Sequence, residues 1–375
     1  YKYRLYPNKE QETRLRQFGG SCRYLWNYFL EKQKQERKEN GKFVFYHEMA
    51  TQLVQEKKNT PWLKETHSQV LQQKLKDLDT ALGNCFKHGR GFPKFKAKRN
   101  FSDSFRYVQG LQYDGNKVYL PKIGWVKRDV HRKLPSIPTS ATVMQDGDKW
   151  YISFVVEVEC QPEIQVKEAV GLDLGINNFL VTSDDEKVEN PKFLDKSLKQ
   201  LRKKQRQLSR KKKGSNNRRK QQLAVYNQYK KIRNQRLDFL HQISNQITND
   251  YDLICTEDLN VVGMTKNRKL ARSIGQAGWR AFTGMLQYKS EMKGKAAVKI
   301  DRFAPSTQTC AMCGKRHTLT LNDRWFSCDC GSHCVDRDHN AALNIVRWGI
   351  AEYTRGTRGI NACGDTSSGD ILSGM

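Results

Sequence analysis

The sequence contains no long hydrophobic run, and it has few acidic residues for its length. No segment approaches the roughly 18 consecutive apolar residues of a transmembrane helix, and none near the start has the pattern of a signal peptide. The 375 residues include 39 Asp and Glu against 67 Lys and Arg, which gives a formal net charge of +28. Such an excess of one sign costs stability unless a polyanion neutralises it. We therefore expect nucleic acid, and not a membrane, to be the partner.

The ten cysteines do not have the distribution of a disulfide framework. Five of them lie between residues 310 and 334 in a spacing that indicates metal ligation, and the other five are scattered singly. Scattered single cysteines are typical of a reducing compartment, so we expect a cytoplasmic protein. The length is sufficient for two or three domains.

The hydrophobic pattern predicts a multidomain protein with α+β and α/β parts. A strand-like segment at residues 1–6 precedes a region of helical periodicity, with breaks near residues 40 and 60. Short runs rich in Val, Tyr, Ile and Trp follow, and residues 150–159 form the clearest strand. We therefore predict a small β domain into which a helical block is inserted. Its interleaved aromatic and basic residues suit nucleic-acid binding, although half-buried strands with solvated charges would show the same pattern.

A second basic region lies within residues 193–249, which have the near-heptad spacing of two long antiparallel helices. Between residues 202 and 220 the chain has eleven basic residues and no acid. A charge run is usually a solvated helix face, but this one lacks compensating acids. We predict that it contacts a polyanion through Arg202, Lys203, Lys204 and Arg206.

Three acidic residues lie within or directly beside apolar segments, where burial of a charged group would be unfavourable. Asp173 interrupts an apolar strand, Glu257 ends a second apolar run, and Asp338 opens an apolar helix. Taken alone, Glu257 would fit a surface strand end and Asp338 a helix cap. Taken in order, the three form an RNase H-like arrangement, in which the carboxylates bind two Mg²⁺ ions roughly 4 Å apart and a phosphodiester is hydrolysed.

The cysteine-rich segment predicts one structural Zn²⁺ site. Cys310 and Cys313 have the spacing of a zinc knuckle, and Cys328 and Cys330 form its second half. The Cys-x-Cys half is tighter than the usual Cys-x-x-Cys. Because Cys334 is near enough to replace Cys330 or Cys328, the sequence leaves the ligand set open.

These motifs resemble those of the TnpB family of transposon-encoded RNA-guided nucleases, which are relatives of type V CRISPR effectors. They are RLYPNKEQ and FPKFK in the N-terminal part, GLDLGINNF from Gly171, TEDLN from Thr256, AGWRAFTGMLQYKSEMKG from Ala277, APSTQTCAMCG from Ala304 and DRDHNAALNI from Asp336. The motifs stand in the family's order and cover nearly the whole chain, so together they are highly specific.

The resemblance implies an N-terminal wedge-like β barrel with an inserted helical recognition lobe, followed by an RNase H-like RuvC domain with an inserted zinc module. The expected ranges are 1–16 and 91–166 for the barrel, 17–90 for the lobe, 167–304 and 335–350 for the RuvC domain, 305–334 for the target-nucleic-acid zinc module and 351–375 for a C-terminal tail.

The resemblance also implies a metal-dependent, RNA-guided DNA endonuclease. Its guide RNA would derive from the transposon end, and it would cleave double-stranded DNA beside a short adjacent motif. By motif match Asp173, Glu257 and Asp338 take the catalytic roles, and we choose Asp338 over Asp336. The chain departs from the family pattern at the second cysteine pair, where four residues separate Gly331 from Asp336, one more than expected.

Two alternative functions share these features. A nuclease-inactive, RNA-guided DNA-binding repressor would lack one or more of the three acids, and here all three are present. A guide-free, structure-selective nuclease would not need the long basic N-terminal half. We find no helix-turn-helix or tandem finger array that would read a long site. The sequence does not determine the oligomeric state, and our expectation is a monomer bound to RNA.

Overall fold

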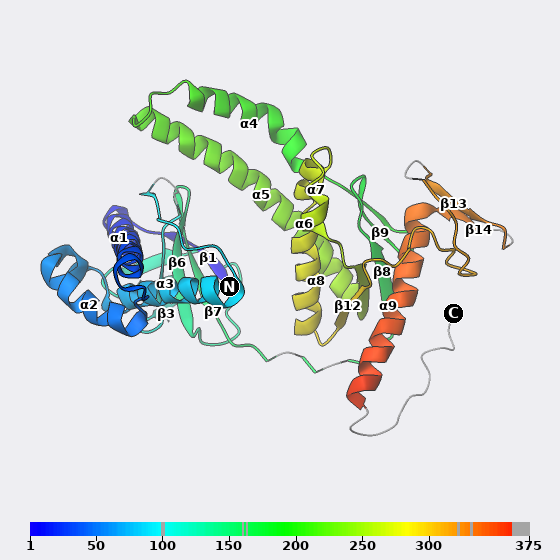
Figure 1. Cartoon of the computed structure of the whole chain (residues 1–375), viewed down its shortest axis with the longest axis horizontal. Coiled ribbons are helices and arrows are strands. Elements are labelled where there is room, and N and C mark those ends of the chain that lie inside the picture. The colour runs from blue at the N-terminus through cyan, green and yellow to red at the C-terminus, as the bar shows by residue number, and fades with distance from the viewer. Residues whose placement is uncertain (99–101, 160, 163, 321–322, 331–332, 362–375) are drawn as a thin grey trace. The chain divides into compact units, whose positions relative to one another are not determined.

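The computed structural model describes residues 1–98, 102–159, 161–162, 164–320, 323–330 and 333–361. The chain divides into two compact units, Tyr1–Glu159 and Cys160–Met375, and each has its own sheet and hydrophobic core (Figure 1). Within the described part of the chain, no helix is both long and apolar enough to cross a membrane.

The first unit contains a seven-stranded antiparallel sheet in the order β2-β6-β7-β1-β5-β4-β3. Its strands are β1 (Lys2–Tyr6), β2 (Ser104–Tyr107), β3 (Gln112–Asp114), β4 (Lys117–Leu120), β5 (Gly124–Arg128), β6 (Ser140–Asp146) and β7 (Lys149–Val155). The N-terminal strand β1 pairs with both β5 and β7. The helices that follow β1 are therefore inserted in the sequence between two strands of the same sheet. Strands β2 and β3 are the edges and do not pair with each other in the described residues. Closure into a barrel therefore stays a prediction.

Helices follow β1 directly in the first unit. They are α1 (Lys9–Asn40), α2 (Tyr46–Asn59), the 3₁₀ turn η1 (Pro61–Glu65) and α3 (Ser68–His88), so the predicted breaks near residues 40 and 60 are confirmed. Asn8 and Gln11 form a capping box at the start of α1, and Gly41 ends the helix in the left-handed conformation. Leu15 and Phe18 of α1 belong to the core of the sheet, whereas Leu25 and Phe29 belong to a core among the helices. The expected domain boundary between residues 16 and 17 thus falls inside one helix.

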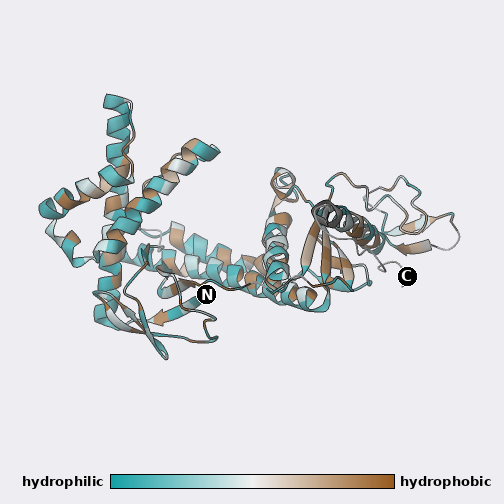
Figure 2. Ribbon diagram, turned by 90° about the horizontal axis from the view of Figure 1, so that it is seen from below, coloured by the Kyte–Doolittle hydropathy of each residue, from teal (hydrophilic) through white to brown (hydrophobic). Residues whose placement is uncertain are grey.

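The second unit is built on a five-stranded sheet in the order β10-β9-β8-β11-β12. Its strands are β8 (Ala169–Asp173), β9 (Asn178–Thr182), β10 (Lys187–Glu189), β11 (Leu253–Glu257) and β12 (Ala296–Ile300). Strands β8, β11 and β12 are parallel, and β9 and β10 join as antiparallel neighbours. The central strands are almost continuously hydrophobic, as expected for a sheet covered on both faces (Figure 2).

The helices of the second unit are α4 (Phe193–Ser209), α5 (Asn216–Asp250), α6 (Val261–Met264), α7 (Ala271–Ala277), α8 (Trp279–Met292) and α9 (Arg337–Asn361). Helices α4 and α5 form a long hairpin. The antiparallel pairing predicted for α4 and α5 is confirmed (Figure 1). Arg218 at the start of α5 donates to the carbonyl of Leu208, near the end of α4. Gln205 lies one turn before Leu208 in α4, and its side chain donates to the hydroxyl of Tyr229, which lies three turns after Arg218 in α5.

Helices cover both faces of the second sheet. Side chains of α5 and α8 pack on Val170, Leu172 and Ile254, and α9 packs on the opposite face, which includes Leu253 and Cys255. Between β12 and α9 the chain forms a small hairpin of β13 (Trp325–Cys328) and β14 (His333–Asp336). The expected start of a tail at residue 351 falls inside α9, and residues 362–375 lie outside the described residues.

Glycines bring α9 unusually close to the sheet. A Cβ atom on Gly171 of β8 would lie 2.1 Å from the carbonyl oxygen of Ala342, and one on Gly349 of α9 would lie 2.2 Å from the sulfur of Cys255. Real Cβ atoms do not approach other atoms so closely, so only glycine fits at these two crossings. The contacts fix how α9 is placed along β8 and β11.

Candidate active site and zinc site

Asp173 and Glu257 lie side by side at the ends of two parallel strands. Leu172 of β8 is opposite Thr256 of β11, so the next residue of each strand is an acid. Side chains alternate along a strand, and Gly171 and Cys255 both face α9. Asp173 and Glu257, two residues further along, therefore point toward the same face.

Asp338 joins them from the first turn of α9. Ala342 lies directly over Gly171, and Asp338 is four residues earlier, one helical turn nearer to the end of β8. The close approach of α9 to the sheet thus brings the third acid beside Asp173. The structure brings together all three acids that the sequence analysis singled out.

The charge of the cluster is poorly compensated. Burial, together with the carboxylates of Glu257 and Asp338, raises the pKa of Asp173 to about 8, against the opposing effect of Arg337. Burial also raises the pKa of Glu257, although a hydrogen bond from the Ser306 hydroxyl opposes this shift. The Arg337 guanidinium lies 3.4 Å from the carboxylate of Asp338. A site with these properties favours a bound cation.

The carboxylates are not drawn tightly together. In the described part of the chain, the one group of three or more potential ligand side chains whose donor atoms all lie within 4.8 Å is a set of four cysteines. The donors of the acid cluster are all carboxylate oxygens, the ligand type that Mg²⁺ prefers.

Asp336 has a structural role distinct from that of Asp338. Its carboxylate accepts a hydrogen bond of 2.9 Å from the backbone N–H of Asp338, as a helix cap does, and forms a 2.9 Å ion pair with Lys187 of β10. Burial alone would raise the pKa of Asp336, but these donors hold it below its usual value. The cap in this motif is therefore Asp336, which leaves Asp338 for the acid cluster.

Ser306, Asn340 and Asn344 support the site and were missed by the sequence analysis. The side-chain amide of Asn344 donates to the carbonyls of Ser306 (2.8 Å) and Thr309 (2.6 Å), and that of Asn340 donates to Thr309 (2.7 Å). Both asparagines are almost fully buried on α9. They hold the segment that runs from Ser306, the partner of Glu257, to the first zinc-site cysteine. Two asparagines four residues apart on an otherwise apolar helix face are a signal that the sequence offered.

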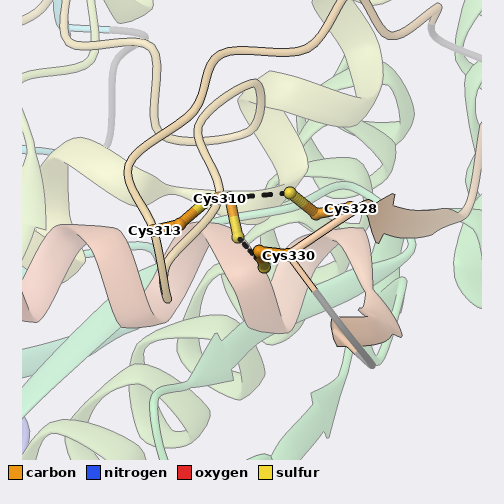
Figure 3. Close-up of side chains that lie close together, drawn as sticks. All are labelled: Cys310, Cys313, Cys328 and Cys330. Atoms are coloured by element: carbon orange, nitrogen blue, oxygen red, sulfur yellow. Dashed lines mark hydrogen bonds between the residues drawn. The ribbon is translucent and has the colours of Figure 1, made fainter.

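The four cysteines of the predicted zinc site converge, and Cys330 takes the fourth place. Figure 3 shows Cys310 beside Cys330, with 3.8 Å between sulfurs, and Cys313 beside Cys328, with 3.6 Å. Ligand sulfurs of a tetrahedral Zn²⁺ site lie about 3.8 Å apart, so these positions fit the ion. The sulfur of Cys334 is not part of the group. The backbone N–H of Lys315 lowers the pKa of Cys313 to about 7, which favours the thiolate that a metal needs.

Replacing Cys330 with serine should remove the zinc, and replacing Cys334 with serine should not. Loss of one of four ligands weakens a site whose module has only a small core of Cys310, Phe326 and Cys328. We expect close to one zinc per chain in the wild type and in Cys334→Ser, and much less in Cys330→Ser, measured by elemental analysis of freshly purified protein. Loss of zinc in Cys334→Ser but not in Cys330→Ser would show that Cys334 is the fourth ligand. Wild-type protein without zinc would exclude the zinc site.

Of the four residues predicted to contact nucleic acid, Arg202, Lys203 and Arg206 are exposed on α4. They form no ion pair with any described acid. Lys204 is half-buried, and its ammonium group donates to the side chain of Gln228 on α5 (2.8 Å). Three of the four cations thus remain available to a polyanion, and the fourth, Lys204, connects α4 to α5 by a hydrogen bond.

Three family models match parts of the chain. A model described as "Probable transposase" matches residues 153–268, and the Cas12f1-like TNB domain matches residues 279–345. A model described as a helix-turn-helix domain matches residues 1–42, where the sequence analysis found no such motif. In the structure these residues form strand β1 and one uninterrupted helix, α1, and not two helices joined by a turn.

The chain also resembles whole proteins. It is 34% identical to InsQ, a candidate RNA-guided DNA endonuclease of Escherichia coli strain K12, over 97% of this chain and 94% of InsQ. It is 35% identical to a candidate RNA-guided DNA endonuclease of Streptomyces pristinaespiralis, over 97% of this chain and 90% of the relative. A cryo-EM structure of a Cas12f1–sgRNA–target DNA complex contains a similar fold, with a TM-score of 0.59 and 13% identity over 90% of this chain and 82% of that one.

Proposed function

The chain belongs to the TnpB family of transposon-encoded, RuvC-type RNA-guided nucleases, and from this membership we propose that it is an RNA-guided DNA endonuclease. It uses a guide RNA from the transposon end and cleaves double-stranded DNA beside a short adjacent motif. The observation that carries the proposal is the convergence of Asp173, Glu257 and Asp338 where β8, β11 and α9 meet.

In this proposal the three acids bind two Mg²⁺ ions. When bound, the ions supply an activated water and stabilise the leaving 3′-oxygen. The chain's own residues prepare the site. Ser306 orients the carboxylate of Glu257 through its hydrogen bond, and Arg337 lies beside Asp338. Burial and the neighbouring carboxylates raise the pKa of Asp173, and a bound cation would favour its deprotonated form.

Changing the guide segment of the RNA should redirect cleavage. In an RNA-guided enzyme, base pairing chooses the target, and the protein reads a short adjacent motif and the backbone shape of the heteroduplex. We expect protein loaded with a new guide to cut a DNA that matches the new guide and to spare the old target. The measurement is cleavage of both DNAs by the wild-type complex, with guide-free protein as the control. Cutting that stays at the old site, or proceeds equally well without RNA, would contradict the proposal.

Neutralising the exposed cations of α4 should weaken nucleic-acid binding at every target sequence. Each phosphate contact contributes about 0.9 to the slope of log K against log salt for duplex DNA. The triple variant Arg202→Gln, Lys203→Gln, Arg206→Gln should therefore lower affinity and reduce that slope by up to about 3. The matched control is Lys204→Gln, because Lys204 contacts Gln228 inside the hairpin. An unchanged slope in the triple variant would exclude this surface as a phosphate track.

A further inference from the structure

The two most exposed aromatic side chains among the described residues lie on either flank of the acid cluster. Phe303 is 87% exposed and Trp325 is 66% exposed, and the next aromatic residue is 51% exposed. A large apolar side chain held in water gains no hydrophobic stabilisation from folding. Aromatic side chains are enriched at binding surfaces relative to the rest of a protein surface.

Phe303 is held beside Glu257 by a loop that is fastened at both ends. Ile300 is the strand partner of Glu257, and Ser306 donates to its carboxylate, so Phe303 is three residues from each anchor. Three residues span at most about 11 Å. Within the loop, the backbone N–H of Phe303 donates to Asp301 (2.6 Å), and the guanidinium of Arg302 binds Asp258. The backbone is therefore held in place while the phenyl ring projects into solvent.

Trp325 lies near Asp338, at the other flank. It is the first residue of β13 and is paired with Asp336, the cap of α9. Directly opposite residues on antiparallel strands project from the same face, with Cβ atoms about 4.5–5.5 Å apart. Asp336 also contributes to the electrostatic field at Asp173. The indole is thus a near neighbour of the residues that begin α9.

Basic side chains lie near Glu257. A hollow of about 210 Å³ beside Glu257 is lined by Arg280, Lys299 and Arg302, and Arg302 directly precedes Phe303 and is paired with Asp258. Exposed aromatic rings next to basic side chains are the combination that binds single-stranded nucleic acid, since the rings stack on bases while the cations meet phosphates. Stacking requires unpaired bases, because each base of a duplex is already covered by its neighbours.

We propose that Phe303 and Trp325 stack on unpaired bases of the DNA strand that enters the acid cluster, and so determine which phosphodiester is cut. They are positioning residues, because they touch the substrate bases and not the reacting atoms. The inference rests on the proposed function and adds to it the two side chains that hold the strand on either side of the acids.

Cleavage by the guide-loaded protein tests the proposal. Phe303→Ala and Trp325→Ala should each raise KM by about tenfold and spread the cut over neighbouring phosphodiesters, and Phe303→Trp should restore a single cut. Thermal stability should not change, because both side chains are mostly exposed. Tyr288→Ala is the control, since Tyr288 is partly exposed on α8, which covers the opposite face of the sheet. Alanine variants with wild-type KM and cut position would overturn the proposal.

A binding measurement separates this inference from the proposed function. The probe is a single-stranded DNA oligonucleotide containing 2-aminopurine, whose fluorescence is quenched when the base stacks. Quenching by the wild type that is lost in the double variant Phe303→Ala, Trp325→Ala supports stacking, even if no guide directs cleavage. Equal quenching by wild type and double variant would overturn the inference, even if guided cleavage is found.

Discussion

Replacing Asp173 with asparagine should slow DNA cleavage by about a thousandfold or more, while the RNA-bound protein should still bind its target. The substitution keeps the size of the side chain and removes the negative charge that would bind metal at the centre of the cluster. Metal stabilisation of a phosphoryl transition state contributes several kcal/mol, and about 4 kcal/mol corresponds to a thousandfold in rate. The measurement is the single-turnover cleavage rate in Mg²⁺, together with target affinity.

Matched variants identify the acids that serve the reaction. Glu257→Gln and Asp338→Asn should fail like Asp173→Asn. Asp336→Asn should still cleave, because Asp336 caps α9 and pairs with Lys187. If Asp336→Asn is inactive and Asp338→Asn is not, the assignment within this motif is wrong.

The same Asp173→Asn variant should gain stability where it loses activity. The pKa of Asp173 is raised from 3.8 to about 8 in the folded protein, so the folded state binds its proton more tightly than the unfolded chain does. Between about pH 4 and pH 8 the metal-free wild type therefore loses stability as the pH rises. Asparagine has no proton to lose, so the variant should have the higher melting temperature at pH 8 without Mg²⁺. Equal melting temperatures of the wild type and the variant at pH 8 would show that the ionised carboxylate of Asp173 does not destabilise the folded protein.

Replacing Gly171 with alanine should disable the enzyme without changing any acid. The new methyl group would lie 2.1 Å from the carbonyl oxygen of Ala342 and 2.6 Å from the nitrogen of Val346. Both are backbone atoms, so α9 has to move as a unit. Such overpacking costs about 1–3 kcal/mol or more. Displacement of Asp338 by about 1 Å should slow cleavage by about a hundredfold.

Gly284→Ala on α8 is the control for this variant, because a Cβ there meets no atom within 4 Å. It should be neutral or slightly stabilising, since alanine favours helix more than glycine does. Denaturant unfolding and cleavage rate are measured for both variants. A fully active and stable Gly171→Ala protein would show that the close contact between α9 and β8 does not position Asp338.

Local patterns were sufficient to predict the main elements and the acids of the site. The hairpin of α4 and α5 follows from its near-heptad spacing, and β8 and β11 follow from short apolar runs that end in an acid. Asp173 was identifiable because a charged residue inside an apolar strand needs a compensating partner. These signals are contained in segments of a few turns or one strand.

Details that depend on contacts between distant segments could not be predicted in the same way. Ser306 reaches Glu257 across 49 positions of the chain, and no local pattern marks a serine for that role. The choice between Cys330 and Cys334 depends on how the β13–β14 hairpin turns, because both are close enough in sequence to reach the site. Lys204 has the same sequence context as its basic neighbours, yet of the four residues predicted to contact nucleic acid it alone contacts Gln228. Only the three-dimensional arrangement distinguishes these residues.

The central position of β1 imposes an order of events during synthesis. Tyr3 is paired with Ile152, so the first strand of this unit cannot complete its pairing until about 150 more residues have been made. At about 5–20 residues per second, this delay lasts about 8–30 s. The core among α1, α2 and α3 lies entirely within residues 25–82, so these helices can associate during the wait. The sheet is therefore completed last, and β1 is exposed to wrong partners for longer than any other strand of the first unit.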